Sequence, residues 1–579
     1  MAKTDSQPTN QLREWTLMFY MASDNPLAPA VVSQLKAIKS AGYHPEANVL
    51  VQFDPCTEGT PTHIFDVNLI NKLKKPGKTK IGFTGFGPSD PFIVDMLEDK
   101  LWRDQTDRHG KVTIRERIRA NLPSYDPPMP PQIELGLAQE SKTKNECDTP
   151  DKSKEPDPEK SLRAFLTFCR KHYPARHYML FILGHGVVVG NDVFLYDEHA
   201  DKHSLSLREL GRLLKEFRNK ISKDADFELV GFHSCSMSSL EVAYELKGTA
   251  KYMLASQGPA FVGSWPYRQI LMRVFLDLKK KGSRIDVKTM LKRIFYYCLH
   301  NSTDYLVAGY SFDLSLCSLN PDIVTAIRRP LEELSTALST ALPDPQDLDA
   351  AKKQIKEILL LAHWESQSYW QESYTDLFDF CFCLSRRCRG FENDEGQLGE
   401  YKRRIFNASE ALMSQLRKEQ RQEDGKLVVR SEFAGPAYQY SHGLSVFFPW
   451  AKPSEDSNIL KEYKCYKFKD TTWLSFLSKY FDSTQRHTLR EELSLPPQNP
   501  EEELREDIAS LVYNDEGQLS SGNSLAPPAD KVDPRDKTGD DCHCPTIKNF
   551  PRDTRPRRQR GRRAFGIAVP TSDTFFEDR

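Results

Sequence analysis

Short apolar runs alternate with stretches of helical periodicity between Trp15 and Leu254. This alternation is typical of a mostly parallel β-sheet covered by helices, and it constrains the fold more than any other feature of the sequence. The apolar runs are rich in β-branched and aromatic residues, which suits strands buried on both faces. They predict strands at 15–21, 48–54, 177–183, 227–232 and 251–256. We therefore expect an α/β fold.

The stretches between these strands predict helices at 27–41, 206–219 and 239–247. Ser206 followed by Glu209 has the spacing of a capping box, a common helix start. Residues 123–160, between the second and third strands, are dense in proline, lysine and acidic residues, which indicates a disordered insertion. The neighbouring segment 93–121 has some helical spacing, and a helix and a loop are both compatible with it.

The composition divides the chain into regions. We expect a disordered N-terminus at 1–14, the α/β domain at 15–265, a mainly helical accessory region at 266–490 that completes it, and a disordered tail at 491–579. Amphipathic spacing predicts accessory helices at 268–281, 286–300, 320–342, 346–362 and 399–420, and a strand at 443–450. The tail contains an arginine-rich run at 555–563.

Two of the predicted strands end in reactive side chains. His185 lies between two glycines just after the third strand, and Cys235 follows the fourth strand shortly before a helix start near Ser238. Open α/β folds place their sites at the carboxyl ends of parallel strands, so we expect these side chains to lie close together. A helix start near the cysteine would favour its thiolate form.

This pair predicts covalent catalysis by a cysteine. A thiol is a weak nucleophile, and an imidazole can take its proton and later protonate a leaving amine. Backbone N–H groups of Gly186 and Cys235 would then stabilise the oxyanion. Such chemistry requires no organic cofactor. A small buried core residue is the simpler interpretation of a lone cysteine, and the catalytic one depends on the pairing with the Gly-His-Gly turn, on the spacing and on the resemblance described next.

The chain resembles the clostripain family of cysteine peptidases, the C11 type, whose fold is caspase-like. The resemblance rests on residues 15–27, 173–186, 229–267, 374–380, 442–449 and 467–480. It implies that His185 is the catalytic base and Cys235 the nucleophile. Their separation of 50 residues also matches the order and spacing of caspases. The implied activity is hydrolysis of peptide or protein substrates, with self-processing as a further expectation.

The resemblance also suggests residues that bind substrate. Ser256 and Gln257 match positions that line the substrate site, and Asp24 matches a motif after the first strand. Members similar to clostripain usually carry an acid two residues before the cysteine, where this chain has His233. Because a histidine supplies no carboxylate for a guanidinium, we expect a preference that is not restricted to arginine. Calcium is suggested by the resemblance alone, since no EF-hand loop is present.

Two other interpretations of the sequence compete with a peptidase. The first is a non-catalytic scaffold of the same fold that binds partners through the insertion and the basic tail. The second is a zinc site, which we do not expect because the paired ligand spacing of structural zinc motifs is missing. The residues considered for it are His185, His199, His203, His233 and Cys235. We therefore predict no metal ligands.

Charge and composition restrict the partners and the location. The chain has 80 Lys and Arg against 81 Asp and Glu, so no overall field favours nucleic acid or an anionic membrane. The N-terminal residues do not resemble a signal peptide, and no apolar run approaches the length of a membrane span. Twelve cysteines without regular spacing fit a reducing compartment. We expect an intracellular, cytoplasmic protein, with a nuclear one as the alternative from the basic tail.

Overall fold

The computed structural model describes residues 12–25, 27–53, 63–67, 157–186, 194–197, 203–281, 285–301, 306, 310–344, 349–369, 372–417, 425–453 and 459–484. They form two compact units. The first comprises Met1–His185, Phe194–Gly231 and Pro266–Tyr297, and the second comprises Gly186–Val193, Phe232–Trp265 and Cys298–Arg579. The segment 93–121, most of the insertion, the tail and its basic run lie outside the described residues.

The sheet of the first unit confirms the expected α/β fold. Its strands are β1 (Arg13–Met21), β2 (Ala47–Phe53), β3 (His63–Asp66), β4 (Ala175–Leu183) and β5 (Asp226–His233). They are ordered β5-β4-β1-β2-β3. Strand β1 pairs with β2 and β4 in parallel, whereas β3 pairs with β2 antiparallel. The sheet is thus mostly parallel, with one antiparallel edge strand that the sequence pattern did not predict.

Several helices lie in the part of the first unit that the structure describes. They are α1 (Ala28–Ser40), α6 (Pro158–His172), α7 (Leu207–Lys220), α9 (Tyr267–Lys281) and most of α10 (Val287–Asn301). Helix α7 begins with the predicted capping box between Ser206 and Glu209. The last residues of the expected insertion, Pro158 to Lys160, instead form the first turn of α6, which Asp157 caps. A proline suits this turn because its missing N–H would have no helical partner there.

The described residues of the second unit contain two groups of paired strands. Strands β6 (Tyr252–Ala255), β7 (Phe312–Ser318) and β10 (Val428–Ala434) are ordered β6-β7-β10 and pair antiparallel. Strands β8 (Ser368–Tyr369), β9 (Tyr374–Asp376) and β11 (Ser445–Phe447) form a smaller sheet in the order β11-β9-β8. Residues 266–490 therefore contribute strands to this unit as well as helices.

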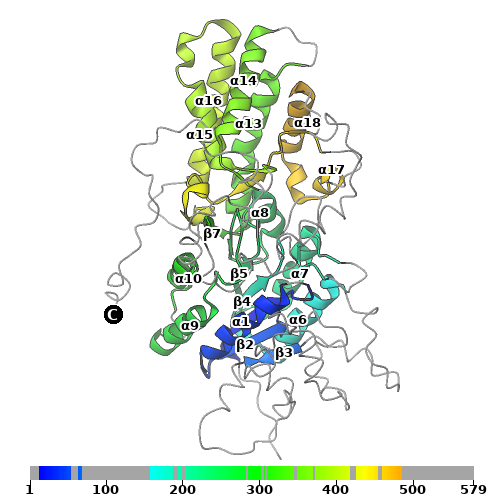
Figure 1. The fold of residues 1–579 in the computed structure, drawn as a ribbon, viewed down its shortest axis with the longest axis vertical. Helices are drawn as coiled ribbons and strands as arrows, with labels where there is room; N and C mark the ends of the chain where they lie inside the picture. The colour runs from blue at the N-terminus through cyan, green and yellow to red at the C-terminus, as the bar shows by residue number, and fades with distance from the viewer. Residues whose placement is uncertain are drawn as a thin grey trace, which may run out of the picture. The chain divides into compact units, whose positions relative to one another are not determined.

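The described helices of the second unit include those predicted at 239–247, 320–342, 346–362 and 399–420 and others that were not predicted. They are α8 (Leu240–Leu246), α12 (Pro321–Ala326), α13 (Arg328–Ala341), α14 (Ala350–Glu365), α15 (Leu377–Cys388), α16 (Gly396–Arg417), α17 (Ile459–Tyr463) and α18 (Trp473–Thr484). Helices α13 to α16 lie side by side (Figure 1). The single helix predicted at 320–342 is two helices, because Pro330 is accommodated only in a first turn. Within the described ranges, no helix has the length and apolar character needed to cross a membrane.

Candidate active site

Cys235 lies in the turn that leaves strand β5. The next residue, Ser236, has a φ of 57°, in the left-handed region that residues other than glycine seldom adopt. Helix α8 begins at Leu240, with Ser239 as its N-cap, close to the start expected near Ser238. The thiol is therefore presented by a strained turn rather than by the first turn of a helix, and it is half-buried.

The turn is held by the segment that follows strand β6. Ser236 N–H donates to the carbonyl of Gly258 at 3.0 Å, and Ser238 N–H donates to the carbonyl of Ser256 at 2.8 Å. Ala260 N–H points at the Cys235 Sγ atom, 3.4 Å away. A backbone N–H that donates to sulfur stabilises its thiolate form. This contact favours the ionised, nucleophilic state of the cysteine.

Gly186 packs directly against the backbone of Cys235. A Cβ atom placed on Gly186 would lie 1.7 Å from the carbonyl oxygen of Cys235 and 3.0 Å from its nitrogen. Both residues belong to the second unit. Only a residue without a side chain permits this approach. Position 186 therefore requires glycine because of the close packing, and not because of an unusual φ angle.

His185 is the last residue of its segment in the first unit. The side chain is buried, 8% exposed, and burial lowers the pKa of His185 to about 4. Its Nε2 atom has no hydrogen-bond partner among the described residues. At neutral pH the imidazole is therefore uncharged, which is the state in which it can accept a proton.

The first unit also contains Asp24 and Asn25, which follow strand β1. Asp24 is buried, with 2% of its surface exposed. Asn25 donates through Nδ2 to the carbonyls of Ala22 and Tyr196, at 3.0 and 2.9 Å, and its Oδ1 accepts from Leu27 N–H at 2.9 Å. Asn25 thus shapes the turn that leads into α1, while a contact of Asp24 with substrate stays a prediction.

Ser256 and Gln257 lie beside the cysteine turn, but their side chains point into the protein. Ser256 Oγ donates to the carbonyl of Gly258 at 3.0 Å. Gln257 is fully buried: its Nε2 donates to Asp376 Oδ2 at 2.9 Å, and its Oε1 accepts from Gly443 N–H at 2.8 Å. Both side chains organise the segment behind Cys235, and a direct role in binding substrate stays a prediction.

His233 is the last residue of strand β5 and is also buried. Its Nε2 is 2.6 Å from the carbonyl of Phe261, to which it donates, and 3.3 Å from Ser264 Oγ. The imidazole stacks on Trp265 with ring centroids 4.8 Å apart. Burial lowers the pKa of His233 to about 4, although the bond to Phe261 raises it by a smaller amount. His233 is therefore a neutral hydrogen-bond donor inside the second unit.

This buried histidine predicts a loss of stability in acid. Between pH 6.5 and about 4 the unfolded chain protonates His233 and the folded chain does not. Stability at this site is therefore lost as pH falls through that window, by on the order of 2 to 3 kcal/mol. We expect the urea midpoint of His233→Gln, which has no titrating group, to fall less than the wild-type midpoint between about pH 7 and about pH 4.5. Parallel curves for the two proteins would contradict this explanation.

Sequence reasoning missed two buried carboxylates in the second unit. Asp313 on β7 accepts the N–H groups of Gln257 and Gly258, both at 2.8 Å. Asp376, at the end of β9, accepts from Gln257 and from His442 N–H. Burial raises the pKa of Asp313 to about 6 and that of Asp376 to about 7. The only sequence signal for Asp376 is the family resemblance of the segment 374–380. No local sequence pattern marks Asp313.

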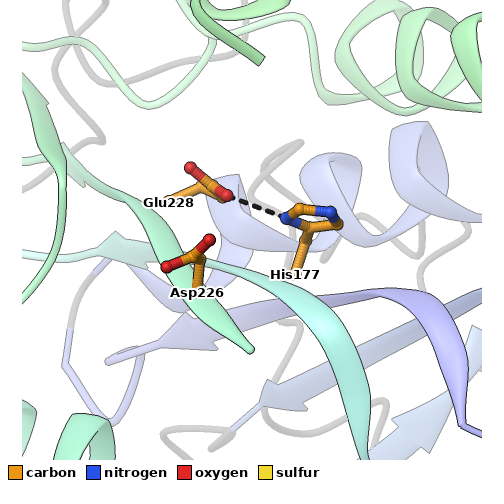
Figure 2. Close-up of side chains that lie close together, drawn as sticks. All are labelled: His177, Asp226 and Glu228. Atoms are coloured by element: carbon orange, nitrogen blue, oxygen red, sulfur yellow. Dashed lines mark hydrogen bonds and ion pairs between the residues drawn. The ribbon is translucent and has the colours of Figure 1, made fainter. Parts of the chain in front are cut away.

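One group in the first unit has the composition of a metal site. His177 on β4 and Asp226 and Glu228 on β5 present ligand atoms that all lie within 4.8 Å of one another (Figure 2). His177 Nδ1 is 2.8 Å from Glu228 Oε1, and its ring stacks on Trp15. These residues stand near the amino ends of their strands, away from the carboxyl ends that precede His185 and Cys235. A hydrogen bond between histidine and buried carboxylate explains the contact without a metal.

The structure thus shows a mostly parallel α/β sheet and a cysteine in a strained turn at the end of a strand. The model of the clostripain family, peptidase C11, matches residues 139–478. The chain therefore belongs to the clostripain family and is a cysteine-type peptidase. No curated protein sequence matches the chain.

Solved structures of C11 proteases are similar to the chain over most of its length. An inactive zymogen C11 protease from Parabacteroides distasonis is 18% identical, with a TM-score of 0.41, and the match covers 80% of this chain and 99% of that one. A secreted C11 cysteine protease from Bacteroides thetaiotaomicron, in complex with an irreversible peptide inhibitor, is 13% identical, with a TM-score of 0.41 and coverage of 81% and 99%.

Proposed function

We propose that the protein is an endopeptidase that cleaves peptide bonds through an acyl-enzyme on Cys235, with His185 as its base. The observation that supports this most is the packing of Gly186 on the backbone of Cys235. His185 is joined to Gly186 by one peptide bond, so their Cα atoms are about 3.8 Å apart. His185 is thus the direct chain neighbour of the glycine that packs on Cys235.

The reaction follows from these groups. His185 takes the thiol proton, and the Cys235 sulfur attacks the carbonyl carbon of the peptide bond. We assign the backbone N–H groups of Gly186 and Cys235 to the resulting oxyanion. The imidazolium gives its proton to the leaving amine as the C–N bond breaks. Water, deprotonated by His185, then attacks the thioester and releases the carboxylic acid, and Cys235 recovers its proton.

This mechanism uses no organic cofactor, and calcium stays a prediction that rests on the resemblance. The substrate class is a peptide or protein. We also keep the expectation that cleavage is not restricted to arginine. The state of His233 is consistent with this expectation. Its imidazole is neutral and hydrogen-bonded to the Phe261 carbonyl, and it supplies no carboxylate to pair with a guanidinium.

A peptidyl reagent with a thiol-directed warhead tests the proposal. We expect covalent labelling at Cys235, located by mass spectrometry, at a rate far above that of Cys465, which is an exposed thiol in the same unit. Labelling requires both a bound peptide and a reactive thiolate, which a non-catalytic scaffold does not combine. Equal labelling of Cys235 and Cys465 would favour the scaffold and contradict the proposal.

A further inference from the structure

The segment Ser256–Ala260, which we call the thiol-facing segment, contacts the turn of Cys235 through three of its backbone groups. Its carbonyls at Ser256 and Gly258 accept N–H groups from Ser238 and Ser236, and its Ala260 N–H donates to the Cys235 sulfur. Backbone groups have no freedom of their own to adjust, so the position of the whole segment decides whether Ala260 N–H reaches the sulfur.

Asp313 holds this segment from the opposite side. Its Oδ2 accepts from Gln257 N–H and its Oδ1 from Gly258 N–H, both at 2.8 Å. The carboxylate is 3% exposed. Gly258 packs tightly against its neighbours: a Cβ atom on it would lie 3.0 Å from Asp313 Oδ1 and 3.1 Å from the ring of Tyr438. One carboxylate thus fixes two consecutive peptide units.

We propose that Asp313 is a positioning residue that sets the reactivity of Cys235, by holding the thiol-facing segment where Ala260 N–H can donate to the thiolate. The proposal deepens the proposed function and rests on it. A carboxylate has two acceptor oxygens for the two N–H groups, and hydrogen bonds to a charged acceptor are about twice as strong as neutral ones. Burial excludes the water that would otherwise compete for the same N–H groups.

The test compares Asp313→Asn with Asp379→Asn in the full chain. The asparagine at 313 keeps the size of the side chain, but its NH₂ group faces one of the two N–H donors and cannot accept from it. Asp379 is a matched control, since it is also fully buried and accepts a backbone N–H at 2.9 Å, that of Gln367, a residue outside the thiol-facing segment.

The readout is the rate at which iodoacetamide alkylates Cys235, with Cys465 as an internal reference. This small reagent needs no peptide site, so it reports the thiol alone. We expect Asp313→Asn to slow alkylation of Cys235 by about 10- to 100-fold, the range that a small misplacement of a reacting group produces. Alkylation of Cys465 should not change, and Asp379→Asn should stay near the wild-type rate. With a peptide substrate, kcat should fall more than KM changes.

Gly258→Ala is a second variant that displaces the segment without removing a buried charge, and it should slow alkylation in the same direction. If Asp313→Asn does not fold, the alkylation rate of Gly258→Ala still tests the proposal. Wild-type rates at Cys235 in Asp313→Asn, or equal losses in both Asp→Asn variants, would overturn the positioning role. If wild-type Cys235 reacts no faster than Cys465, the proposed function itself fails, which is a different result.

Discussion

Replacing Cys235 with alanine is expected to lower kcat for peptide hydrolysis by at least about 10⁴-fold, because the acyl-enzyme can no longer form. His185→Ala should lower it by a similar factor. The two effects should not add, since residues that act as one unit lose most of the rate with the first deletion. Kinetics of both single variants and the double variant on one peptide substrate measure this.

The fold should survive these substitutions. Cys235 lies half-buried in a turn, and His185 follows the end of β4 rather than forming part of the strand. Circular dichroism and thermal unfolding of each variant provide the control, as does Cys465→Ala, which should keep full activity. Mass spectrometry of wild type beside Cys235→Ala also tests self-processing, which we expect within 123–160. Full peptidase activity in Cys235→Ala would end the hypothesis.

The strands that could be predicted are those whose side chains are almost all apolar. Strands β1, β2 and β4 have this character because they are buried on both faces, and the sequence alone locates them within two residues. Strand β7 was missed although each of its residues is buried, since Asp313 and its serines break the apolar pattern. Strand β10 was missed because most of its residues are only half-buried.

The candidate site divides in the same way. His185 and Cys235 follow predictable strands, and both carry distinctive local signals. The residues around the cysteine depend on contacts across long stretches of sequence, such as Ser236 with Gly258 and Gln257 with Asp313, which no periodicity records. The sequence offers several serines as the N-cap of α8, and the structure selects Ser239, whose side chain accepts a hydrogen bond from Val242 N–H.

The packing of Gly186 on Cys235 gives the most specific structural test of the site. A Cβ atom at position 186 would lie 1.7 Å from the Cys235 carbonyl oxygen, which is closer than two non-bonded atoms can approach. An alanine must therefore push the two backbones apart by more than about 1 Å. Displacements of this size cost about 10²-fold in rate when they misplace a reacting group.

We therefore expect Gly186→Ala to lower kcat/KM by about 10³-fold or more. The displacement moves His185, which is bonded to Gly186, and it also moves the Gly186 N–H that we assign to the oxyanion, whose loss alone costs about 10²- to 10³-fold. Overpacking should also lower the stability, by about 1 to 3 kcal/mol. Gly425→Ala is the matched control, because a Cβ there meets nothing within 4 Å, and its activity should match wild type. A folded Gly186→Ala protein with wild-type kcat/KM would show that Gly186 and Cys235 do not pack together in the working enzyme.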